Sequence, residues 1–121
     1  MPLQPEHISK AERNEKFAET VAKTAYLDWA VTIIFYAALH YVDAILAASS
    51  IHPDNHTQRD DAIGTNATLL KVRSEYRTLE TLSQNARYRA MKIDGNDFAE
   101  AQRNFTVIRV HLRSRMKLPT E

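Results

Sequence analysis

The chain of 121 residues contains no cysteine, two glycines and four prolines. The lack of cysteine excludes disulfide bonds and thiolate chemistry, and it suits a reducing compartment. Because glycine and proline mark turns, so few of them favour a handful of long helices over many short strands. No segment alternates apolar and polar residues for long enough to indicate a sheet. The sequence therefore predicts one all-α domain over residues 1–121.

Common enzyme signatures are also missing. The sequence has no glycine-rich phosphate loop, no nucleophile elbow and no H-E-x-x-H pair. His52 and His56 are four residues apart, but Pro53 lies between them and interrupts the helical geometry that would present both to a metal. We therefore expect no metal and no cofactor. Residues 1–16 contain no long apolar run, so we expect no signal peptide and a cytoplasmic location.

The longest apolar stretch, Asp28–Ala48, also contains His40 and Asp43. As a helix, it would place its polar residues on one side and apolar residues around the rest. In a membrane, burying an ionised Asp43 would cost about 2.5–3.5 kcal/mol. We therefore interpret the stretch as the core helix of a soluble bundle, with no membrane partner. Its polar side then needs hydrogen-bond partners inside the protein.

Further helices are predicted on both sides of this core helix. The first begins at Ser9, where Ser9-x-x-Glu12 matches a capping box. A short helix follows between Pro53 and Gly64. A long helix spans Ala67–Arg89, and the last one begins near residue 96 or 97. Together they predict an up-and-down bundle of four long helices plus one short helix, with flexible ends at 1–8 and 118–121.

Charge is distributed unevenly along the chain. Residues 1–66 carry five Lys or Arg against nine Asp or Glu, whereas residues 67–121 carry eleven against six. The last predicted helix contributes Arg103, Arg109, Arg113, Arg115 and Lys117, with no acidic residue among them. A basic helix of this kind suits RNA or an acidic protein partner, and it is equally the pattern of a solvated surface.

Two pairs of polar residues are candidates for chemistry. His40 and Asp43 lie one helical turn apart, so the carboxylate can orient the imidazole as a general base, or the histidine can be a satisfied core residue. His56 and Arg59 share one face of the predicted short helix. They can receive a phosphate together, or Arg59 can pair with the neighbouring acidic residues Asp60 and Asp61.

The densest candidate lies in the stretch SQNARYRAMK. Arg87 and Tyr88 are followed by Arg89 and Lys92 near the C-terminus of a predicted helix. Cations are favourable there simply because of the helix dipole. An aromatic ring between arginines is also an arrangement that stacks a base while holding its phosphate. The candidate ligand-binding residues are therefore His40, His56, Arg59, Arg87 and Tyr88.

Four motifs give the chain a family resemblance. They are W-A-V-x-x-x-F-Y-A-A-L-H at residues 29–40, H-P-x-x-H-x-x-R at 52–59, Y-R-x-L at 76–79 and S-x-x-A-R-Y at 83–88. With them, the chain resembles the HEPN families of small prokaryotic α-helical proteins. The resemblance implies an up-and-down bundle that forms a homodimer with a cleft along its interface. It also implies handling of RNA or nucleotides, often in toxin–antitoxin or anti-phage defence modules.

The match departs from the ribonuclease members of these families. Their pattern is an arginine and a histidine separated by four to six residues, whereas seven residues separate Arg103 from His111 here. We therefore expect a HEPN-like homodimer that binds RNA, a nucleotide or a partner protein without the standard ribonuclease motif. The alternative is a metal-independent endoribonuclease whose active site departs from that pattern.

Overall fold

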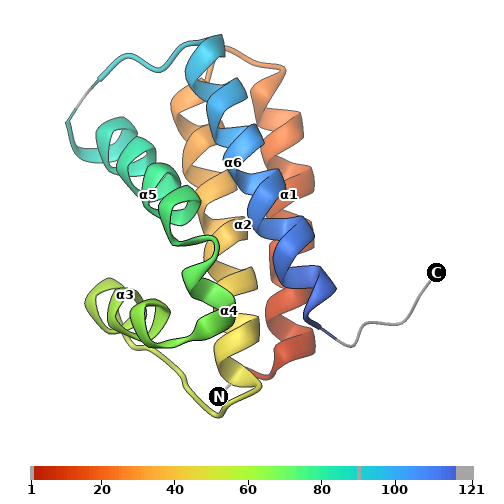
Figure 1. The fold of residues 1–121 in the computed structure, drawn as a ribbon. Coiled ribbons are helices and arrows are strands. Elements are labelled where there is room, and N and C mark those ends of the chain that lie inside the picture. Colours follow the sequence, from red (N-terminus) through yellow and green to blue (C-terminus); the bar gives the residue numbers. More distant parts are fainter. Residues whose placement is uncertain (1, 90, 117–121) are drawn as a thin grey trace.

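The computed structural model describes residues 2–89 and 91–116, and it forms α-helices without any strand over those ranges. The helices are α1 (Gln4–Ala22), α2 (Leu27–Ala47), α3 (His56–Thr65), α4 (Ala67–Leu70), α5 (Arg73–Tyr88) and α6 (Gly95–Ser114). The four long helices α1, α2, α5 and α6 run alternately up and down (Figure 1). The predicted all-α, up-and-down bundle is confirmed.

Helix α2 is the central element of the bundle, because α1, α5 and α6 all pack against it (Figure 1). Its aromatic side chains Phe35 and Tyr41 are completely buried. By length and hydropathy alone, α2 could cross a membrane, but 78% of its most apolar stretch is buried inside the bundle. The core helix of a soluble protein passes the same test, so the burial supports the interpretation of this segment as a core helix.

Helix α1 begins earlier than the sequence pattern predicts. It starts at Gln4, with Pro5 in its first turn, where a missing N–H costs nothing. The carboxylate of Glu6 accepts a hydrogen bond from the backbone N–H of Leu3 at 3.1 Å. The predicted start at Ser9 is therefore wrong. Residues 4–8 of the predicted flexible end are helical, while the predicted flexible end at 118–121 lies outside the described residues.

The helix predicted over Ala67–Arg89 is two helices in the structure, α4 and α5. They are separated at Lys71 and Val72, where the backbone of Val72 leaves the helical conformation with φ −120° and ψ 15°. Both Leu69 and Val72 remain buried, so the break keeps two apolar side chains in the core. The predicted short helix between Pro53 and Gly64 corresponds to α3, and the break adds a second short helix, α4, where the start of the long helix was predicted.

The two ends of the bundle differ. Helices α3 and α4 lie at the end where α1 begins and α2 ends (Figure 1). At the other end, the N-terminus of α2 is close to the C-terminus of α5, because these two packed helices run in opposite directions. The predicted site residues are divided between these two regions, because His56 and Arg59 belong to α3 whereas Arg87 and Tyr88 end α5.

Candidate functional site

Arg87 is held among aromatic rings near the C-terminus of α5. It follows Ser83 by one helical turn, on the face of α5 that packs inward, and its Nε donates to the carbonyl of Ser83 at 3.3 Å. Its Nη1 donates to the hydroxyl of Tyr36 at 2.9 Å and to that of Tyr88 at 3.3 Å. The guanidinium carbon lies 4.8 Å from the ring centroid of Tyr88 and 5.5 Å from that of Tyr36. These contacts fix the orientation of the guanidinium plane within the protein.

A pocket of about 360 Å³ lies next to this arginine, between the start of α2 and the end of α5. Its two large aromatic residues are exposed, Trp29 by 57% and Tyr88 by 74%. The hydroxyl of Thr32 donates to the backbone carbonyl of Asp28 at 2.9 Å. The residues that line the pocket are Asp28, Trp29, Thr32, Ala86, Arg87 and Tyr88. Two of the five predicted site residues, Arg87 and Tyr88, therefore share one pocket.

Three residues at or beside the pocket were not among the site residues predicted from the sequence: Asp28, Trp29 and Tyr36. One signal was present: Asp28, Thr32 and Tyr36 follow one another at four-residue intervals on the polar side of the core helix. Trp29 carries no such signal, because an exposed tryptophan in the first turn of a buried helix cannot be told from a core residue by periodicity.

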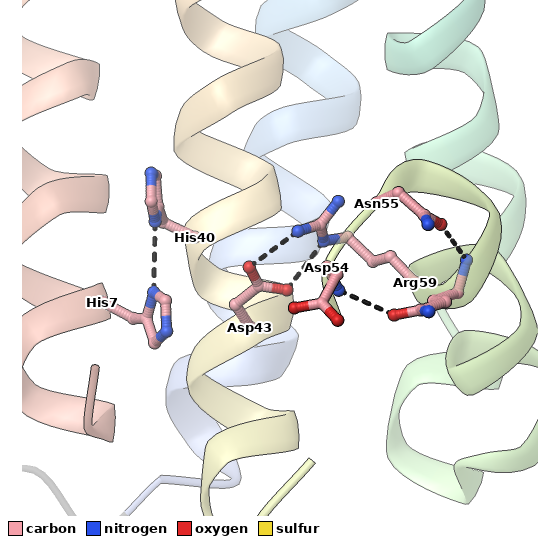
Figure 2. Close-up of polar contacts among 7 residues, drawn as sticks. His7, His40, Asp43, Asp54, Asn55 and Arg59 are labelled. Carbon is pink, nitrogen blue, oxygen red and sulfur yellow. Dashed lines mark hydrogen bonds and ion pairs between the residues drawn. The ribbon is translucent and has the colours of Figure 1, made fainter. Parts of the chain in front are cut away.

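Arg59 is committed to a buried ion pair. Its Nε and Nη2 donate to the two carboxylate oxygens of Asp43 at 2.7 and 3.0 Å, from α3 to α2 (Figure 2). Each side chain is 9% exposed. Burial disfavours the charged guanidinium, but the hydrogen bond and charge of Asp43 outweigh it and raise the pKa of Arg59. The predicted alternative partners, Asp60 and Asp61, do not take this role.

His40 pairs with His7 of α1 and not with Asp43, so the orienting pair, one of the two alternatives for His40, does not form. The Nδ1 atoms of the two imidazoles are 3.2 Å apart (Figure 2). Asp43 uses its carboxylate for Arg59 instead. Burial, with a smaller contribution from His7, lowers the pKa of His40 to about 4, and burial also lowers the pKa of His7. Both rings are therefore neutral near pH 7, and one Nδ1–H donates to the other ring.

His56 lies near the pocket but does not line it. It is exposed at the start of α3, and its ring centroid lies 6.0 Å from that of the buried Phe35. The guanidinium of Arg87 lies 6.0 Å from the same ring. The ring of Phe35 thus lies close to both His56 and Arg87, but of these two only Arg87 lines the pocket.

Comparison with known families identifies the fold. The HEPN domain matches residues 5–109, which include all of the predicted site residues. The chain belongs to the HEPN domain family. A search of curated proteins finds no match to it.

In this HEPN domain, much of the basic charge of α6 is already paired. Arg109 forms an ion pair with Glu15 of α1. Arg113 approaches Glu12 of α1 to 3.5 Å and donates to the hydroxyl of Tyr41 at 3.3 Å. The acidic half of the sequence therefore neutralises part of the basic half inside one molecule, and Lys117 lies outside the described residues.

Arg103 and His111 of the HEPN domain contact different neighbours. His111 is within hydrogen-bond distance of the carbonyl of Thr68, with Nε2 at 3.0 Å. Arg103 lines a wide groove of about 800 Å³ together with Glu15 and Glu19 of α1. Over residues 2–89 and 91–116, no group of three or more His, Asp or Glu side chains is arranged to hold a metal ion.

Proposed function

We propose that this HEPN domain protein binds RNA or a nucleotide in the pocket between α2 and α5. The observation that carries the proposal is the pair of exposed aromatic rings, Trp29 and Tyr88, which line one pocket with the immobilised Arg87. Stacking on an aromatic side chain is worth about 1–3 kcal/mol per base and is available to every base. An arginine plane can stack on a base or hold a phosphate in the same place.

The two exposed aromatic rings line the same pocket. A single exposed aromatic residue is ordinary, because much of a protein surface is apolar, but Trp29 and Tyr88 are exposed together at one pocket. Exposed aromatic residues beside a fixed cation support a binding role better than a packing role. Arg59 and His40 support the fold through Asp43 and His7, so we place neither in the proposed site.

The proposal includes a homodimer and a role in defence or toxin–antitoxin modules, as the family resemblance implies, and a cytoplasmic location, as the composition and the N-terminal sequence suggest. On the chain itself, Val107 and Val110 of α6 are 48% and 60% exposed, which supports contact with a second copy. The endoribonuclease alternative stays a prediction. Incubating the protein with total RNA tests it, since cleavage that disappears in the His56→Ala variant would favour that alternative.

Trp29 is the only tryptophan of the chain, so its fluorescence reports directly on the proposed pocket. Titration with a single-stranded RNA oligonucleotide should change this fluorescence, and the affinity should decrease as salt increases because phosphate contacts release counterions. Arg87→Ala should weaken binding. Arg89→Ala is the matched control, because it removes the same charge from the exposed residue two positions along the chain, outside the pocket. No binding of RNA or mononucleotides at low salt would contradict the proposal.

A further inference from the structure

The pocket is lined by one acidic and one basic side chain, which do not interact with each other. Asp28 of α2 and Arg87 of α5 both line it, yet they form no ion pair with one another. Within the described ranges, no hydrogen bond or ion pair reaches the carboxylate of Asp28, although its backbone carbonyl accepts from Thr32. A ligand between the two helices can therefore contact a carboxylate and a guanidinium together.

The hydrogen-bonding capacity of each group is defined. An ionised carboxylate only accepts, and a guanidinium only donates. In Arg87, Nε is used by the carbonyl of Ser83, and Nη1 is used by two tyrosine hydroxyls. Nη2 has no partner in the described part of the chain, so its two N–H groups remain available for a ligand. The pocket thus offers a pair of acceptors from Asp28 and a pair of donors from Arg87.

Among the four RNA bases, this combination fits guanine best. Guanine has two adjacent donors, N1–H and the N2 amine, and two adjacent acceptors, O6 and N7, on its other edge. Adenine and cytosine would direct a ring-nitrogen lone pair at the carboxylate, and uracil offers a single N–H between two carbonyl oxygens. An unfavourable lone pair facing a carboxylate costs affinity because neither group can donate.

We propose that the pocket selects guanine, with Asp28 accepting from N1–H and N2–H, Nη2 of Arg87 donating to O6 and N7, and the base stacked at Trp29 and Tyr88. This inference rests on the proposed binding of RNA or a nucleotide and adds the identity of the base. The competing explanation is that Asp28 only stabilises the first turn of α2 through the helix dipole. That explanation requires no preference among bases.

A series of mononucleotides tests the inference in the unmodified protein. Fluorescence of Trp29 and calorimetry are used to compare GMP with AMP, CMP, UMP, inosine monophosphate and 7-deaza-GMP. Inosine lacks the N2 amine, and 7-deazaguanine lacks the N7 acceptor. Loss of a hydrogen bond to a charged group should weaken each analogue about tenfold relative to GMP. Equal affinity for all six would overturn the guanine inference and leave the proposed function standing.

A second comparison separates a free nucleotide from RNA. An oligouridine with one central guanosine is compared with plain oligouridine and with GMP. Tight binding of GMP identifies a guanine nucleotide as the ligand, whereas binding of the guanosine-containing oligomer alone identifies an unpaired guanine in RNA, and both support the inference. If neither GMP nor any oligomer binds, the proposed function itself fails, and the guanine inference fails with it.

Two variants test whether Asp28 is the group that distinguishes GMP from inosine monophosphate. Asp28→Asn should reduce the discrimination between GMP and inosine monophosphate to less than about threefold, because an amide offers one acceptor instead of two. Asp61→Asn removes the same charge from an exposed position of α3 and should leave the discrimination unchanged. Circular dichroism checks that both variants remain helical. Full discrimination in Asp28→Asn would overturn the assignment of Asp28 as the group that reads the base.

Discussion

His7 of α1 and His40 of α2 face each other with their Nδ1 atoms 3.2 Å apart (Figure 2). This contact joins the start of α1 to the middle of α2. It can form only while at least one Nδ1 lacks a proton, because two imidazolium rings would have no acceptor between them. Both pKa values are lowered accordingly, chiefly by burial.

The protein should lose stability as pH falls from about 6.5 to about 4. The pKa of His40 is near 6.5 in the unfolded chain and about 4 in the folded one, so the unfolded state binds more protons in this interval. The stabilising contribution is therefore complete above pH 6.5 and decreases as the pH falls toward 4. Urea denaturation of the wild type and of His40→Gln at several pH values measures it. An identical pH dependence in the variant would show that His40 is not responsible.

The Asp43–Arg59 pair gives a second prediction. Arg59→Ala leaves a buried carboxylate without its partner, which should reduce the free energy of unfolding by about 3–5 kcal/mol. Replacing both residues, as in Asp43→Leu with Arg59→Met, should cost less than the single change because no charge then remains buried. Arg77→Ala, at an exposed position of α5, is the control and should change stability by less than about 0.5 kcal/mol. A double variant less stable than Arg59→Ala would contradict this account.

The buried hydroxyl of Tyr76 gives a prediction of opposite sign. It has no hydrogen-bond partner within the described ranges, and burial raises the pKa of Tyr76. Tyr76→Phe removes an unsatisfied polar group and should stabilise the protein by about 1 kcal/mol in urea denaturation. Tyr41→Phe is the matched control, because the hydroxyl of the buried Tyr41 accepts a hydrogen bond from Arg113. Removing that hydroxyl should destabilise the protein. Destabilisation by Tyr76→Phe would indicate a partner for its hydroxyl, such as an ordered water.

The fold was largely readable from sequence because each helix carries its own periodic signal. The core helix predicted over Asp28–Ala48 is observed as α2, Leu27–Ala47. Errors arose where two local signals competed. Ser9 and Glu12 match a capping box, yet the helix starts earlier, where Pro5 and the Glu6 carboxylate satisfy its first turn. The break at Val72 has no glycine or proline to mark it, so periodicity alone could not find it.

The candidate site was less readable because its contacts join distant segments. Arg87 and Tyr88 were found as neighbours in sequence, but the hydrogen bond of Arg87 to Tyr36 spans 51 positions. His7 and His40 are separated by 33 positions, and Asp43 and Arg59 by 16. A helical pattern shows which residues share a face, but tertiary packing decides which faces meet. The partners of polar residues therefore required the structure.

Tyr36 orients Arg87 and should matter for binding rather than for folding. Tyr36→Phe removes the 2.9 Å hydrogen bond to Nη1 and keeps the ring beside the guanidinium. We expect the affinity for an RNA oligonucleotide to fall by about 1 kcal/mol of binding free energy, with little change in thermal stability. Tyr26→Phe, at an exposed tyrosine just before α2, should bind like the wild type. If Tyr36→Phe binds as tightly as the wild type, the preorganisation of Arg87 has no role in the proposed function.

The exposed valines of α6 test the proposed homodimer. Val107 and Val110 line a shallow groove of about 510 Å³ with Thr106, His111 and Ser114. A second copy that packs on this face would bury both valines, so Val110→Lys would place a charge in an apolar contact and should shift the protein to a monomer. Analytical ultracentrifugation over a range of concentrations measures the shift. Arg115→Ala, an exposed change beyond the end of α6, should leave the association unchanged. A wild-type protein that sediments as a monomer at all concentrations would exclude the dimer, whereas a dimer unaffected by Val110→Lys would exclude this face as its interface.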